Sequence, residues 1–275
     1  MWIALTLGLL AAGPSNNLTA ATPEASEAML IAGTAAAATS GSFAVDNHCP
    51  GQDARQVTLH CERTLAQLRM HWAGKCAADS WSPRCKVVLH ASRASYAAAV
   101  GRGGGQTAGS SWLELKEGKI SRRRIDLLGE GGRGLAALPH EMTHLLLAEL
   151  IGCQPPRWAD EGIAILADSG EKQSLHQRDL RQALAGGMAF RVADLLTLEQ
   201  YPQQRVAAFY GQSASLAGFL ARREDPARFV QFVQQAIHEG YDHALQESYA
   251  IANVGDLERL WYADRNGETQ VPKQR

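Results

Sequence analysis

The five residues from His140 to His144 constrain the fold of this chain most, because they read His-Glu-x-x-His. Residues four apart in an α-helix lie on the same face, one turn from each other. The segment therefore predicts a helix that presents both histidines to one metal ion. Glu141 lies one residue around the helix, where it can reach a water molecule on that ion rather than the ion itself.

A third ligand is expected from Glu161, which lies in the stretch WADEG. The apolar residues around it predict a second helix over residues 158–167. Zinc in hydrolytic sites usually has three protein ligands and a fourth position that holds water. We therefore predict one Zn²⁺ ion bound by His140, His144 and Glu161. The alternative for Glu161 is a surface carboxylate near the start of a helix, which is common.

These residue types in this pattern indicate hydrolysis. Zinc lowers the pKa of a bound water to about 7, which makes hydroxide available at neutral pH. Glu141 would accept the proton of this water as it attacks the scissile carbonyl, and would then pass the proton to the leaving amine. A further donor to the oxyanion is usually needed. Tyr210, in a helix predicted over residues 206–221, is our candidate, and the alternative for it is a half-buried core residue. Three other histidines lie in polar stretches and are expected at the surface: His176, His238 and His243.

Two segments carry a resemblance to a known family. The stretches HEMTHLLL and PRWADEGIA resemble the gluzincin branch of zinc metallopeptidases, in which a glutamate on a second helix completes the H-E-x-x-H site. The stretches FYGQSASL and LERLW are similar to the tail of bacterial peptidase-MA-like domains. The resemblance covers roughly residues 86–261, and its specificity is concentrated in residues 139–166.

The resemblance implies a thermolysin-like, or zincin, catalytic domain. It implies that His140, His144 and Glu161 are ligands, that Glu141 is the base, and that the hairpin before the helix borders the substrate cleft.

The sequence departs from the family's pattern at two positions. Pro139 stands where a helix former would be ordinary, and we expect the helix to begin within one turn of it. Ile165 stands where an outer acid usually supports a metal-binding histidine. Because such histidines need an outer partner, we expect Asp160 or Asp168 to take that role.

The remaining pattern favours an α+β fold, with a small N-terminal mixed sheet that has a β-hairpin edge, followed by a mostly helical C-terminal half. Period-two alternation on both sides of Glu117-Gly118 predicts the hairpin. We expect its second strand, residues 119–128, to be an exposed edge that an extended peptide can join. The arginines at 122–124 would lie on an exposed face and protect this edge from aggregation.

The N-terminus indicates export. Residues 2–10 form a short apolar run followed by small residues, as in a secretory signal peptide, although no Lys or Arg precedes the run. We predict a periplasmic or extracellular protein with no stable membrane span once the signal is removed. The expected order is a signal peptide over residues 1–21, a low-complexity flexible leader over 22–47, a single domain over 48–265 and a flexible tail over 266–275.

The chain contains five cysteines, and no two of them form a C-x-x-C pair. A zinc knuckle is therefore not expected, and an exported domain favours one or two disulfides. The sequence does not choose among the pairings of Cys49, Cys61, Cys76 and Cys85. Cys153 is expected to be a buried apolar thiol.

Composition excludes two classes of protein. Hydrophobic residues make up 45% of the chain and the formal net charge is -1, unlike a disordered acidic chain or a basic nucleic-acid binder. The favoured function is an exported zinc metallopeptidase that hydrolyses peptide bonds in peptides or proteins. Two alternatives are a catalytically inactive zinc-binding module of the same fold and an amidase that acts on cell-wall peptides. The sequence does not indicate the number of subunits.

Overall fold

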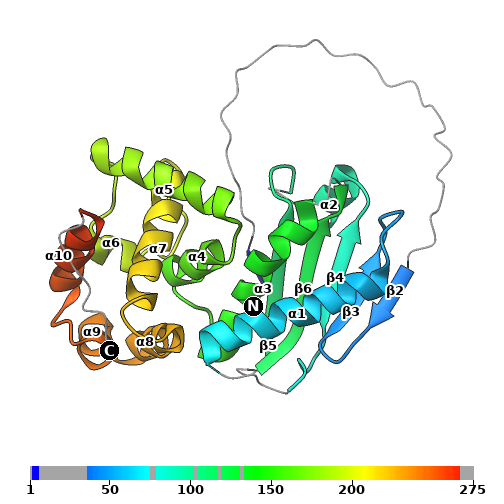
Figure 1. Ribbon diagram of the computed structural model, residues 1–275, viewed down its shortest axis with the longest axis horizontal. Coiled ribbons are helices and arrows are strands. Elements are labelled where there is room, and N and C mark those ends of the chain that lie inside the picture. Colours follow the sequence, from blue (N-terminus) through cyan, green and yellow to red (C-terminus); the bar gives the residue numbers. More distant parts are fainter. Residues whose placement is uncertain are drawn as a thin grey trace, which may run out of the picture.

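The computed structural model describes residues 2–5, 36–74, 79–101, 104–116, 119–130 and 133–266. The chain has an α+β fold, as expected: a mixed sheet is built from the N-terminal half, and a mostly helical region follows it (Figure 1).

The sheet has six strands in the order β1-β5-β6-β4-β3-β2. β4 pairs in parallel with both β3 and β6, whereas β1, β5 and β2 pair antiparallel with their neighbours. The strands are β1 (Trp2–Leu5), β2 (Ala36–Thr39), β3 (Phe43–Asn47), β4 (Cys85–His90), β5 (Gly109–Lys116) and β6 (Lys119–Leu128).

The hairpin is confirmed, but its expected position in the sheet is wrong. β5 and β6 pair antiparallel around residues 117–118. β6 is not an edge strand, because it also pairs in parallel with β4. A parallel partner joined by a long crossover leaves no mark on the local alternation of a strand. The outer side of β5 carries β1.

The arginine run on β6 does not lie on an exposed face. Arg123 is buried, and its guanidinium donates to Glu149 at 2.9 Å. Arg124 donates to Asp126 through two nitrogens, each at 2.7 Å. Only Arg122 is exposed, so the three arginines do not together protect an exposed strand edge from aggregation, as we had expected.

Two helices cover one face of the sheet and one shorter helix covers part of the other. α1 (Ala54–Ala73) and α3 (Arg133–Ile151) pack together against the strands. Side chains of a strand alternate between faces, so Leu89 points into this core while His90 points to the opposite side. There it meets Tyr96 of α2 (Arg93–Val100), with ring centroids 5.8 Å apart.

The remaining helices form the second half of the molecule, on the left of Figure 1. At its centre is α7, which is buried along most of its length and packs closely on α4. Trp158 and Trp261 belong to its core, and both are 0% exposed. The helices are α4 (Arg157–Leu166), α5 (Gly170–Ala185), α6 (Val192–Leu196), α7 (Val206–Ala221), α8 (Pro226–Glu239), α9 (Tyr241–Tyr249) and α10 (Val254–Arg265).

Two further expectations need correction. The flexible leader over residues 22–47 is too long, because β2 and β3 lie within it; residues 22–35 lie outside the described residues, as do most of the expected signal peptide and tail. Cysteines are also not paired as expected, since Cys49, Cys61, Cys85 and Cys153 are all free, and Cys76 lies outside the described residues. Cys61 and Cys85 are fully buried and act as small apolar core residues. Within the described residues, none of the helices is both long and apolar enough for a bilayer crossing.

Candidate metal centre

The two histidines of the H-E-x-x-H segment lie side by side on α3. The helix begins at Arg133, so Pro139 lies inside it rather than in its first turn as expected. The carbonyl of Pro139 accepts a hydrogen bond from the hydroxyl of Thr143 at 2.7 Å. One turn separates the histidines, and their ring centroids are 4.9 Å apart. Both are at most 3% exposed, so α3 presents them to the interior rather than to solvent.

Glu161 reaches the same point from α4. Its neighbour Gly162 faces α7, where an added Cβ would lie 2.6 Å from the carbonyl oxygen of Ser213. Only a glycine lets the two helices pack this closely, and the packing of α4 is what brings the carboxylate inward. One ligand atom each from His140, His144 and Glu161 lies within 4.8 Å of the other two.

Three atoms at this point are buried and have no hydrogen-bond partner: Nε2 of His140, Nε2 of His144 and Oε2 of Glu161. Buried polar atoms are nearly always bonded to something. Two imidazole nitrogens and a carboxylate oxygen that converge on one centre form a donor set suited to a cation. The three residues could therefore hold a metal ion, as the sequence indicated.

Each histidine is also bonded on its other ring nitrogen. Nδ1 of His140 lies 3.0 Å from Asp168 Oδ2, and Nδ1 of His144 lies 2.8 Å from Asp160 Oδ1. A carboxylate at Nδ1 places the proton there and leaves Nε2 as the free donor to a metal. The sequence led us to expect Asp160 or Asp168 in this role, and both residues fill it, one for each histidine.

The site carries an excess of negative charge. Four carboxylates are buried around it, those of Glu141, Asp160, Glu161 and Asp168. Burial disfavours a cationic His144, yet the charge of Asp160, with Glu161 and Glu141, outweighs burial and raises the pKa of His144 to about 10. Burial also raises the pKa of Glu161, against the opposing effect of both histidines. Buried charges are normally paired, so a bound cation would complete this arrangement.

Glu141 lies at the border between α3 and β5. The hydroxyl of Ser111 donates to Oε2 of Glu141 at 2.8 Å. A Cβ at Gly109 would lie 2.7 Å from Cγ of Glu141, so the first residue of β5 passes directly against this side chain. The carboxylate is thereby fixed beside the histidines, 3% exposed, without being one of the converging ligand atoms.

A cavity of about 230 Å³ opens beside His140 and Glu141. Tyr210 lines it and is 4% exposed, so this candidate is both a core residue and a residue of the site. Burial, together with the nearby charge of Glu161, raises the pKa of the Tyr210 phenol and keeps it protonated. Much of the remaining wall is apolar and comes from β5 and its approach, α3, α5 and α7: Ala108, Ala137, Leu175, Val206 and Ala207.

His176 lines the same cavity, and its expected surface position is wrong. It is 6% exposed, and burial lowers its pKa, so the neutral ring is favoured. Its ring centroid is 5.9 Å from that of Tyr210. The polar sequence of α5 concealed this position, because only one face of that helix is buried. His238 and His243 are exposed, as expected.

Two other residues touch the site, and no sequence pattern indicated either of them. Ser111 contacts Glu141 only because β5 lies beside α3. Tyr201 donates a hydrogen bond from its hydroxyl to Oε1 of Glu161. It lies in the irregular stretch between α6 and α7, where no periodicity marks an inward side chain.

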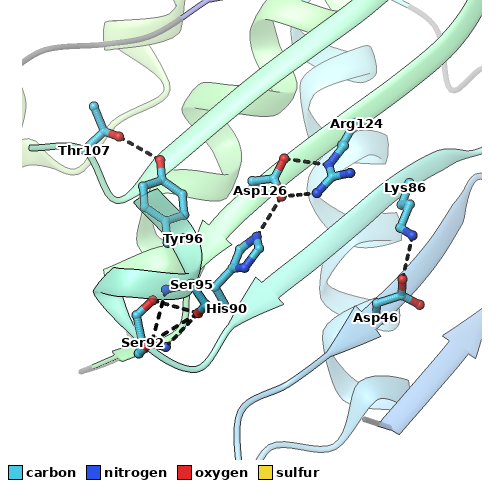
Figure 2. A network of polar contacts seen from close by, with 9 residues as sticks. All are labelled: Asp46, Lys86, His90, Ser92, Ser95, Tyr96, Thr107, Arg124 and Asp126. Carbon is cyan, nitrogen blue, oxygen red and sulfur yellow. Dashed lines mark hydrogen bonds and ion pairs between the residues drawn. The ribbon is translucent and has the colours of Figure 1, made fainter. Parts of the chain in front are cut away.

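A second polar network lies on the opposite face of the sheet, and Figure 2 shows its members. Nε2 of His90 lies 2.7 Å from Asp126 Oδ1, and Asp126 also accepts both hydrogen bonds of the Arg124 guanidinium. Nearby, the hydroxyls of Tyr96 and Thr107 are 2.7 Å apart. Burial disfavours the charge of Asp126, but the hydrogen bonds from His90 and Arg124 outweigh it and lower the pKa of Asp126.

Known protein families provide no independent identification of the metal centre. A scan against protein-family models finds no match for the chain, and a search of the curated proteins finds no significant match. The function therefore has to be inferred from the geometry of the site.

Proposed function

We propose that this protein is a zinc-dependent metallopeptidase of the gluzincin type, with a thermolysin-like catalytic domain. The observation that carries the proposal is the convergence of three buried, unpartnered ligand atoms beside Glu141, at the wall of an open cavity. A structural metal site would have no need for an additional carboxylate next to the ligands or for access from solvent.

Zinc is the metal that fits this donor set best. Two histidines and one glutamate are a known ligand set of hydrolytic zinc sites, which keep one position open. When bound, the metal would supply an acidified water molecule and a centre that polarises the scissile carbonyl.

The residues around the ligands support separate roles. Glu141 is the general base that takes a proton from the attacking water and returns it to the leaving amine. Ser111 holds that carboxylate through its 2.8 Å hydrogen bond. Tyr210 remains protonated in its buried position and can donate a hydrogen bond to the developing oxyanion.

The surroundings of the cavity favour a peptide substrate. β5 begins at the cavity, where Gly109 lies directly against Glu141. The apolar wall of Ala137, Leu175 and Val206 suits an apolar side chain next to the scissile bond.

The proposal is tested by metal content and by hydrolysis of a denatured protein mixture, comparing wild type with Glu141→Gln. Wild type should carry close to one zinc per chain and cleave peptides. The variant should keep the zinc and lose about 10²- to 10⁴-fold in rate, the usual contribution of a general base. Glu171→Gln, the same exchange at an exposed position of α5, should leave both unchanged.

Three results would overturn the proposal. Absence of near-stoichiometric zinc would exclude the metal site. Zinc binding without cleavage of any peptide would favour the inactive module, whereas cleavage of purified cell-wall fragments but not of a peptide library would favour the amidase.

A further inference from the structure

The two carboxylate oxygens of Glu161 have different surroundings. Oε1 accepts the hydrogen bond that the hydroxyl of Tyr201 donates. Oε2 is buried and has no partner among the described residues. Glu161 is 0% exposed, so water does not compete for either oxygen. One oxygen is therefore engaged by the protein, while the other is available to a metal.

Tyr201 is held in this position by the side chains around its ring. The guanidinium of Arg157 lies over its ring, 4.5 Å from the centroid, and Arg157 is itself bonded to the carbonyl of Glu199. On other sides the rings of Phe209 and Tyr210 approach to 5.7 Å and 6.2 Å. Arg157 and Glu161 are four residues apart on α4 and therefore share a face of that helix. Residues of α4 thus contact both the ring and the hydroxyl of Tyr201.

We propose that Tyr201 is a positioning residue that restricts Glu161 to ligation through one oxygen. This inference rests on the proposed zinc site. A carboxylate that binds with both oxygens would, with two histidines, fill the four positions that zinc usually offers. A hydroxyl that occupies Oε1 prevents this and keeps the fourth position open to water. Partners of this kind typically contribute 10- to 100-fold to metal affinity.

The first test compares zinc affinity in Tyr201→Phe and Tyr241→Phe. Tyr241 is the matched control, because its hydroxyl is likewise hydrogen-bonded within the helical half, accepting from Trp158 Nε1 at 2.9 Å and donating to the carbonyl of Leu196 at 3.1 Å. Neither partner is a proposed ligand. Zn²⁺ titration should show a dissociation constant raised about 10- to 100-fold in Tyr201→Phe and unchanged in Tyr241→Phe. Wild-type affinity in Tyr201→Phe, or an equal loss in both variants, would overturn the inference.

The second test uses Co²⁺ in place of zinc, because the visible absorption of Co²⁺ reports its coordination number in wild type as well as in the variant. Wild type loaded with Co²⁺ should give the intense visible absorption of a four-coordinate ion, and Tyr201→Phe should shift toward the weaker absorption of five-coordination. A five-coordinate wild type would overturn the inference. These readouts do not depend on turnover. A protein that binds zinc as expected but cleaves no peptide would refute the proposed function and leave the role of Tyr201 intact.

Discussion

Buried histidines meet aspartates in two regions of this molecule, and the two regions differ in what the histidines leave unbonded. In the sheet network, Asp126 is shared by His90 and Arg124, and no atom of these three is buried without a partner. At the candidate metal centre, His140 and His144 also lie within hydrogen-bond distance of aspartates, yet both Nε2 atoms are buried and unpartnered. A His–Asp pair by itself therefore indicates no function.

The charge balance differs in the same way. Arg124 compensates Asp126 within the network, so that region is complete without a ligand. At the candidate metal centre Lys172 bonds Asp168, and Asp160 and Glu161 have no Arg or Lys partner among their described contacts. Because unpaired buried charge is costly, the candidate metal centre should depend on a bound cation, whereas the sheet network should not.

Removal of the metal should give the largest effect on stability. At free zinc a thousand times the dissociation constant, binding stabilises the folded state by about 4 kcal/mol. A chelator should remove this amount from wild type and from Asp126→Asn alike, because the two regions lie on opposite faces of the sheet and should act additively. Denaturant unfolding with and without chelator measures both differences. A chelator effect much smaller in Asp126→Asn would show that the regions are coupled.

Replacing one histidine from each region should separate metal binding from folding. His144→Ala removes a ligand and should weaken zinc binding beyond the roughly 100-fold expected for an outer partner. His90→Ala leaves Asp126 with Arg124 alone and should lower the free energy of unfolding by about 1–3 kcal/mol, the cost of a broken buried hydrogen bond. Its zinc affinity should equal that of wild type. Zinc titration and unfolding of both variants test this, and a zinc defect in His90→Ala would contradict it.

The outer aspartates should give a smaller effect. Asp160→Asn keeps the shape of the side chain but weakens its hold on Nδ1 of His144, so zinc affinity should fall by about 10- to 100-fold. The same exchange at Asp126 should leave zinc affinity unchanged. Calorimetric titration with Zn²⁺ compares the two variants. Equal affinities would mean that the His–Asp pairs of the metal centre have no special role in ligation.

The local parts of this site could be predicted from sequence, because helical spacing alone places His140 and His144 on one face. The stretch WADEG was sufficient to predict Glu161 as the third ligand. Because metal-binding histidines need an outer hydrogen-bond partner, Asp160 and Asp168 could also be predicted as candidates for that role. Tyr201 reaches the site only through the packing of an irregular segment on α4, which no local pattern records.

The same limit explains the errors in the fold. The hairpin of β5 and β6 follows from alternation around a turn, but the place of β6 between β5 and β4 depends on a parallel pairing that only the complete sheet defines. Arg123 looked like an exposed residue because its partner, the half-buried Glu149, comes from α3. Ser111 likewise contacts Glu141 only across that sheet–helix interface.

The smallest expected effect concerns how the free energy of unfolding changes with acid. In zinc-free protein, the sheet network around Asp126 should contribute to this change. Burial opposes the charge of Asp126, but the hydrogen bonds from His90 and Arg124 dominate and hold its folded pKa below the unfolded value of about 3.9. Such a group contributes stability that is present above the unfolded pKa and is lost as the pH falls through the folded pKa. Asp126→Asn should therefore be less stable than wild type at neutral pH and should lose less stability toward pH 3. Unfolding measured between about pH 3 and pH 7, in zinc-free protein so that metal release does not contribute, tests this. If the free energy of unfolding fell as steeply with decreasing pH in Asp126→Asn as in wild type, the hydrogen bonds of the network would not favour the charged form of Asp126.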